Sequence, residues 1–228
     1  MARRLAPLAV LTLAVLTLTA CTTQPTPPTP SPAPTIAPLT VEQAKLAALR
    51  VADLPKGWDG GVAPDPIPTL RVPITYDPVD CEVLRDPLRD REAPTLSVRG
   101  QYFLRRDSPG GDTDATEVIA WWPTSQLPLL QKIAEMLPRC QTLAGTMEGE
   151  TFHVFARQLP MASLRDGIVL RFGDPADPKL KSGTYTACVV RGGTVLALRG
   201  SSETVTTDAA FVRFVTTAVA RLDAAVGG

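Results

Sequence analysis

The sequence predicts an α+β domain in which one antiparallel sheet packs against helices. Three observations lead to this fold class. Segments with strand-like alternation follow one another without an intervening helix, which favours antiparallel pairing. Helical segments with an apolar stripe separate and close these groups of strands. The folded part, residues 39–228, is about the length of a single domain and shows no internal repeat.

The first 20 residues predict a signal peptide. Arg3 and Arg4 form a positively charged start, and the apolar run over 5–18 is rich in Leu, Ala and Val. A short apolar core between a basic start and small residues is typical of a secretory signal. The run is about 14 residues long, whereas a membrane-spanning helix needs about 20, so a retained transmembrane anchor is not expected.

Cys21 is the predicted site of lipid attachment. The segment Leu18-Thr19-Ala20-Cys21 resembles the bacterial lipobox. The resemblance implies cleavage before Cys21, a diacylglyceryl group on its sulfur and anchoring to the extracytoplasmic side of the cell membrane. Two or more acyl chains anchor a protein stably. The alternative is an ordinary signal peptide followed by an unrelated cysteine.

Residues 21–38 predict a tether, because the segment after Cys21 consists mostly of Pro and Thr. Proline at this density favours the extended polyproline II conformation, with a rise of about 3.1 Å per residue. The segment could therefore hold the domain up to about 50 Å from the lipid surface. We interpret it as a spacer.

The charge balance argues against nucleic acid as a partner. The chain has 23 basic and 23 acidic residues, and removing Arg3 and Arg4 with the signal peptide leaves 21 against 23. The arginines are spread along the chain, whereas nucleic-acid binding calls for a clustered basic surface.

The first half of the domain predicts helices around one strand pair. Thr40 is a suitable N-cap for the first helix, which ends before Pro55 and Gly57. Five prolines between residues 59 and 79 predict an irregular or edge segment. The predicted elements are, in order, helices over 41–50 and 80–88, strands over 96–104 and 115–122 joined by a turn at 107–112, and a helix over 125–136 capped by Ser125.

The second half predicts four strands and a closing helix. Gly192 and Gly193 suit a tight hairpin turn. The closing helix, 208–226, has an apolar stripe formed by Phe211, Phe214, Val215, Ala218 and Leu222. The predicted strands cover 151–157, 167–172, 185–190 and 194–199.

Three cysteines follow Cys21 in a compartment that favours disulfides. Cys81 and Cys140 lie at a helix or a helix exit and are the predicted pair. Cys188 lies within a strand and is expected to be a buried free thiol. A metal site formed by these cysteines and His153 is the alternative, although their spacing matches no structural zinc pattern.

The remaining candidate residues predict neither catalysis nor a cofactor. His153 is the only histidine, and the chain has neither a Gly-x-Ser-x-Gly nor a Ser-x-x-Lys motif. The acidic turns at 107–114 and 173–178 do not match a calcium-binding loop, so no metal is expected. Trp121 and Trp122 end a strand, so one ring is expected to face the core. The other is expected to face outward, where it covers the next helix or lines a cleft.

Several short motifs resemble the extracytoplasmic sensor-like domains of actinobacterial lipoproteins, which are related to the extracellular sensor domain of a mycobacterial receptor Ser/Thr kinase. The matching segments are 52–58 (Ala-Asp-Leu-Pro-Lys-Gly-Trp), 81–84, Cys140, 173–174 and 189–195. The resemblance implies a sheet with helices around a cleft, disulfides and a ligand, with no established catalytic residues. This chain has three cysteines where the kinase sensor has two full pairs, and it has no kinase domain.

These observations favour a tethered, non-catalytic binding module. Its expected partner, besides the membrane, is a small molecule, a glycolipid or an envelope protein. A scaffold lipoprotein that makes only protein contacts is the alternative, and a hydrolase is a third hypothesis. A concave pocket favours the first, and a large flat apolar patch favours the second. A buried Ser or His beside a carboxylate would favour the third.

Overall fold

The computed structural model describes residues 38–63, 74–104, 115–174, 183–201 and 207–227. Residues 36–228 form one compact unit. The predicted signal peptide, Cys21, nearly all of the tether and the predicted turn at 107–112 lie outside the described residues, as does most of the turn at 173–178. Among the described residues, no helix is long and apolar enough to cross a membrane.

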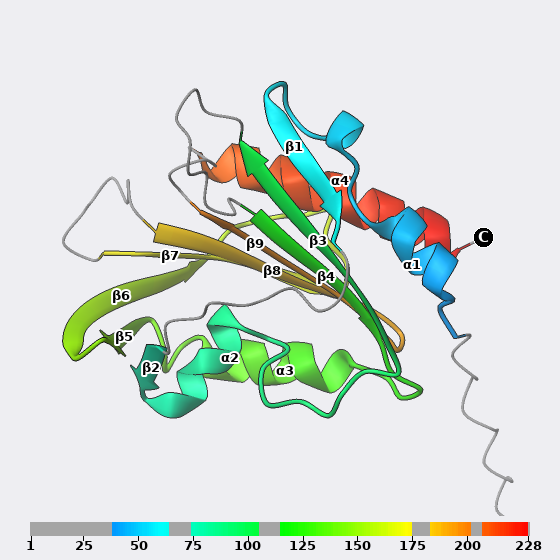
Figure 1. Cartoon of the computed structure of the whole chain (residues 1–228). Helices are drawn as coiled ribbons and strands as arrows, with labels where there is room; N and C mark the ends of the chain where they lie inside the picture. The colour runs from blue at the N-terminus through cyan, green and yellow to red at the C-terminus, as the bar shows by residue number, and fades with distance from the viewer. Residues whose placement is uncertain (1–37, 64–73, 105–114, 175–182, 202–206, 228) are drawn as a thin grey trace, which may run out of the picture. The chain divides into compact units, whose positions relative to one another are not determined.

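The described residues form one antiparallel sheet packed against helices, as the sequence predicts, and the helices lie on both faces of the sheet (Figure 1). The strand order is β1-β3-β4-β9-β8-β7-β6-β5-β2. The strands are β1 (Trp58–Val62), β2 (Ile74–Asp77), β3 (Leu96–Leu104), β4 (Ala115–Trp121), β5 (Thr142–Met147), β6 (Glu150–Gln158), β7 (Gly167–Gly173), β8 (Gly183–Arg191) and β9 (Thr194–Ser201). The helices are α1 (Val41–Ala47), α2 (Glu82–Arg85), α3 (Leu127–Met136) and α4 (Asp208–Val226), with single 3₁₀ turns η1 (Val51–Asp53) and η2 (Val79–Cys81).

Each face of the sheet has its own core. Helices α1 and α4 cover one face, where the predicted stripe of α4 packs on Tyr102, Tyr185 and Leu198. Helices α2 and α3 cover the other, where Leu84 and Ile133 pack on strands β7 to β9. Strands β8 and β9 are buried along most of their length because they lie between the two layers.

Local signals explain where several helices begin. Thr40 forms a capping box with Gln43, as expected for an N-cap, but α1 ends at Ala47, three residues before the predicted end. Thr207 caps α4, whose limits agree with the prediction. The prediction that Ser125 caps α3 is wrong: Gln126 occupies the N-cap position, and the Ser125 hydroxyl accepts only a long hydrogen bond from the Leu127 N–H, at 3.4 Å.

The predicted disulfide is present: Cys81, at the end of η2, is bonded to Cys140, which follows α3. The bond links two segments that are 59 residues apart in the sequence. It ties η2, and α2 immediately after it, to the helix layer beneath the sheet. Cys188 is the free cysteine of the described residues and is buried in the same core.

We expect Cys188 not to react with a thiol reagent while the domain is folded. Burial raises the pKa of this thiol to about 12, so almost no thiolate is present at pH 8. Treating the native domain with Ellman's reagent should release no thionitrobenzoate within minutes, and unfolding it in guanidinium should release one equivalent. The Cys188→Ala variant, which should release none in either state, is the control. Rapid release from the native domain would contradict this burial.

Candidate functional site: a cleft beside the sheet

The face of the sheet that carries α2 and α3 changes from apolar to polar along its strands. Near α3 the strand residues are apolar, as at Ala120 and Val195. Further along the same strands, Thr116 of β4 lies opposite Arg199 of β9, which lies opposite Thr186 of β8. The polar end of this face forms one wall of a cleft.

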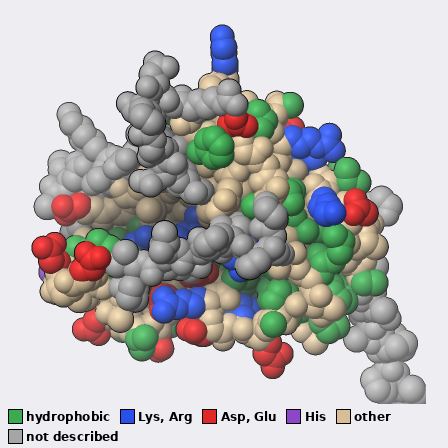
Figure 2. Space-filling view, in the orientation of Figure 1, with side chains coloured by type: hydrophobic (Ala, Val, Ile, Leu, Met, Phe, Trp, Pro, Cys, Tyr) green, Lys and Arg blue, Asp and Glu red, His purple; other side chains and the backbone are tan. Residues whose placement is uncertain are grey.

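The cleft has a volume of about 590 Å³ and lies between α2 with its following loop and the sheet. A volume of this size is typical of sites for small molecules. Figure 2 shows Lys and Arg side chains recessed on this side of the molecule. The lining residues are Ile74, Tyr76, Glu82, Arg85, Asp86, Pro87, Leu88, Arg89, Arg99, Thr116, Val118, Ala197 and Arg199.

Arg85, the last residue of α2, is held in place by aromatic rings. Its guanidinium carbon lies 5.4 Å from the centre of the Tyr76 ring and 5.5 Å from that of Phe172. The Thr186 hydroxyl donates to the Arg85 carbonyl at 3.3 Å, which fixes the end of α2 against β8. Burial lowers the pKa of Arg85, but an arginine remains charged at neutral pH. No carboxylate of the described residues pairs with it.

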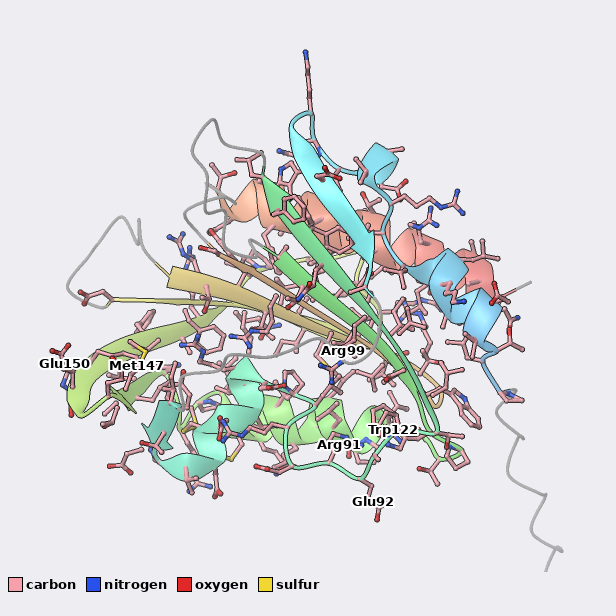
Figure 3. All side chains as sticks on the ribbon, in the orientation of Figure 1. Arg91, Glu92, Arg99, Trp122, Met147 and Glu150 are labelled. Atoms are coloured by element: carbon pink, nitrogen blue, oxygen red, sulfur yellow. A yellow bond between two sulfur atoms is a disulfide. The ribbon has the colours of Figure 1, made fainter. Side chains whose placement is uncertain are left out.

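The opposite wall contributes a second guanidinium. Arg99 of β3 faces the cleft from the sheet, and Figure 3 shows its side chain in the space between β3 and the α2 layer. In the described part of the chain it forms no ion pair or hydrogen bond through its side chain. The cleft therefore has a guanidinium on each wall.

The positive charges act on the phenol of Tyr76. Burial raises the pKa of Tyr76, and the charges of Arg85, Arg199 and Arg89 oppose that rise, in that order of strength. Positive charges on both walls of the cleft therefore lower the pKa of the same phenol. Arg89 also forms an ion pair with Glu82 at the rim.

His153 does not take part in a catalytic arrangement within the described residues. It is exposed on β6, opposite to the buried side chain of Val154, as the alternation predicts. It lines a neighbouring cavity of about 480 Å³, to which Arg85 also contributes. No described carboxylate forms an ion pair with it, and no described group of His, Cys, Asp and Glu could hold a metal ion.

Trp121 and Trp122 face opposite sides of β4, as expected, and Trp122 packs with the following helix α3, but neither ring is exposed. Both faces of β4 are covered, so Trp121 is 8% exposed in the α1/α4 core and Trp122 is 6% exposed in the α2/α3 core. The Trp122 indole N–H donates to the Glu92 carbonyl at 3.1 Å, and the guanidinium carbon of Arg91 lies 5.2 Å from the centre of the Trp122 ring (Figure 3). Trp122 lines a third cavity, of about 410 Å³, which Trp121 does not reach.

The sequence did not predict the residues of the cleft between α2 and the sheet. Arg85, Arg99 and Arg199 come from three segments that only the strand order brings together. One local signal was available in β9, where Arg199 follows Val195 and Ala197 on the same face of the strand. A charged residue at such a position faces either a partner or a cleft.

The described architecture is that of an α+β domain with helices on both faces of an antiparallel sheet and a cleft on one of them. Its fold is similar to that of the extracellular domain of PknH from Mycobacterium tuberculosis, with a TM-score of 0.60 and 14% identity over 85% of this chain and 100% of that chain. This agrees with the sensor-like fold that the sequence motifs indicate. A putative uncharacterized protein of Mycobacterium smegmatis, the Rv0999 ortholog, matches 75% of this chain and 92% of its own, with a TM-score of 0.40 and 9% identity. No protein-family model and no curated protein sequence matches the chain.

Proposed function

We propose that this chain is a lipid-anchored protein on the extracytoplasmic side of the cell membrane, and that its domain binds a ligand in the cleft between α2 and the sheet without catalysing a reaction. The observation that carries the proposal is a cleft of about 590 Å³ with an arginine on each wall. The likeness in fold to an extracellular domain supports the location. The lipobox-like segment ending at Cys21 supports the anchor.

The structure favours this function over a scaffold that makes only protein contacts. No single element among the described residues presents a long row of exposed large apolar side chains; those that are exposed are Val41 and Leu46 in α1, Val51 in η1, Val62 in β1, Val79 in η2, Phe103 in β3, Leu127 in α3, Met147 in β5 and Val226 in α4. Single exposed apolar residues are ordinary, whereas a protein interface usually needs a contiguous patch.

The cleft itself can be tested by filling it. Val118 of β4 lines the cleft and is only half-buried, so Val118→Trp places an indole in the cleft without changing its charge. Native mass spectrometry of the domain purified from its own host should show a bound molecule on the wild type and not on this variant. Val212→Trp, a half-buried position on α4 on the opposite face, is the control. Equal occupancy of the wild type and both variants would overturn the proposal.

We predict that Cys21→Ser abolishes lipid labelling. The serine hydroxyl cannot accept the thioether-linked diacylglyceryl group, so the protein should leave the membrane fraction or remain unprocessed. Metabolic labelling with an alkyne fatty acid, followed by fractionation, measures both effects. Cys188→Ala, which removes a buried thiol far from the anchor, should label like the wild type. Normal labelling of Cys21→Ser would refute the lipid anchor.

A further inference from the structure

We propose that the cleft binds a doubly charged phosphoryl group, and that Arg85 and Arg99 hold that group from opposite walls. The inference rests on the proposed function, because it names the chemistry of the ligand for the same cleft. The phosphoryl group could belong to a lipid headgroup or to a free solute, since both present the same oxygens to the arginines.

The charge of the cleft differs from that of the chain. Among the described residues that line the cleft, four are arginines (Arg85, Arg89, Arg99 and Arg199) and two are acidic (Glu82 and Asp86), so these residues carry an excess of two positive charges. The chain as a whole has equal numbers of basic and acidic residues. A phosphate monoester carries a charge of about −1.5 to −2 at pH 7 and would balance this excess, whereas a single carboxylate would balance half of it.

Arg85 is prepared to bind an anion before any ligand arrives. The rings of Tyr76 and Phe172 restrict its guanidinium, and a hydrogen bond from Thr186 fixes its backbone. Little side-chain entropy is therefore lost on binding. Since burial has already removed much of its water, an ionic hydrogen bond to Arg85 is stronger than one to an exposed arginine.

Arg99 completes the site from the sheet. The guanidinium forks of Arg85 and Arg99 can each form two parallel hydrogen bonds with phosphoryl oxygens, which a lysine ammonium cannot do. The hydroxyls of Tyr76 and Thr116 line the same cleft and can donate to the remaining oxygens. The two arginines therefore fix the position and the orientation of the group.

The rest of the ligand has room beside the phosphoryl group. The cleft of about 590 Å³ is several times larger than one phosphate, which matches a ligand with an organic body. That body would lie along the apolar part of the lining, formed by Ile74, Leu88, Val118 and Ala197. The proposed ligand is thus a phosphorylated molecule with an apolar portion.

The test measures phosphoryl binding to residues 36–228, the compact unit that contains both cores. The probes are inorganic pyrophosphate, followed by calorimetry, and phosphatidylcholine vesicles with 20% phosphatidic acid, followed by flotation. We expect the wild type to bind at least one probe. Pyrophosphate binding alone identifies a free phosphoryl ligand, and vesicle binding alone identifies a lipid headgroup.

Three variants assign the binding to the cleft. Arg99→Gln should weaken it about tenfold or more, because an ionic hydrogen-bond pair is lost. Arg85→Lys should weaken binding similarly, because lysine keeps the positive charge but cannot form the two parallel hydrogen bonds of a guanidinium group. Arg213→Gln removes the same charge from the exposed side of α4 and should leave binding unchanged. If Arg85→Lys does not fold, as shown by circular dichroism, Arg99→Gln decides, because Arg99 is a half-buried residue of the sheet surface.

The outcomes separate this inference from the proposed function. Failure of the wild type to bind either probe, or equal weakening by Arg99→Gln and Arg213→Gln, overturns the phosphoryl inference. If a host-derived molecule is still bound by the wild type and lost in Val118→Trp, the cleft remains a ligand site for another class of molecule. If Val118→Trp also retains every molecule that the wild type binds, both the proposed function and the phosphoryl inference are wrong.

Discussion

Replacing Cys81 and Cys140 together with alanine should lower the free energy of unfolding by about 3 kcal/mol. The disulfide joins residues 59 apart in the sequence. A closed loop of this length restricts the unfolded chain by about 4 kcal/mol in the chain-entropy model, and measured values are usually somewhat smaller. Urea unfolding of residues 36–228, followed by circular dichroism, measures the difference.

The same change should affect the cleft. Helix α2 begins directly after Cys81 and ends at Arg85, so the disulfide holds the wall that carries this arginine. The double variant should therefore bind the cleft ligand more weakly even under conditions where it is fully folded. Cys188→Ala removes a sulfur from the same core without breaking the bond and serves as the control. A double variant within about 0.5 kcal/mol of this control would show that the bond contributes little to stability.

Glu117→Gln should remove a pH dependence from the stability of the domain. Glu117 of β4 is 1% exposed, and its Oε2 accepts hydrogen bonds from the Leu49 N–H at 2.9 Å and from the Tyr102 hydroxyl at 2.7 Å. The Tyr102 hydroxyl also lies 2.9 Å from the Leu49 carbonyl oxygen. A hydroxyl has one proton, so when Tyr102 donates to the Leu49 carbonyl, the contact between Tyr102 and Glu117 is a full hydrogen bond only if a protonated Glu117 donates to the Tyr102 oxygen.

Burial sets the direction of the effect. It raises the pKa of Glu117 to about 7, although the hydrogen bonds from Leu49 and Tyr102 and the charge of Arg221 lower it, while Asp53 raises it further. The folded protein therefore binds more protons than the unfolded chain between pH 4.5 and about 7. The stabilisation is complete below pH 4.5 and is lost as the pH rises through 7. It amounts to about 3 kcal/mol.

Unfolding of the wild type and Glu117→Gln at pH 5, 6, 7 and 8 tests this account. A glutamine keeps the shape of the protonated side chain and does not titrate. The stability of the wild type relative to the variant should fall from pH 5 to pH 7 and level off between pH 7 and pH 8. Glu135→Gln, an exposed change of the same kind on α3, should leave the profile of the wild type unaltered. Parallel profiles for the wild type and Glu117→Gln would show that Glu117 does not titrate in this range.

The sequence predicted the parts of the fold that local interactions determine. Helix α4 has an N-cap at Thr207 and an uninterrupted apolar stripe, and both of its ends were predicted correctly. Strand β5 was missed because its residues, Thr-Leu-Ala-Gly-Thr-Met, are mostly small, and it is held by pairing with β6 and β2. The two edge strands, β1 and β2, were expected only as part of an irregular or edge segment.

The cleft could not be predicted because it depends on the order of the strands. Arg99 and Arg199 are 100 residues apart in the sequence and come together because β9 pairs with β4, which pairs with β3. The tryptophan prediction was correct in placing the two rings on opposite faces of β4. It missed that neither ring is exposed, because helices cover both faces at that point.

The most direct test of the account is to locate the binding site by nuclear magnetic resonance. Residues 36–228 labelled with ¹⁵N are titrated with the molecule recovered from the host. Binding in the cleft predicts that the largest amide shifts occur at its walls: at Arg85 at the end of α2, at Leu88 in the loop after it, at Arg99 in β3 and at Val118 in β4. Shifts along α4 should be small. Shifts that concentrate on α4 or the β1 edge, or that are absent at saturating ligand, would contradict the claim that this cleft is the functional site.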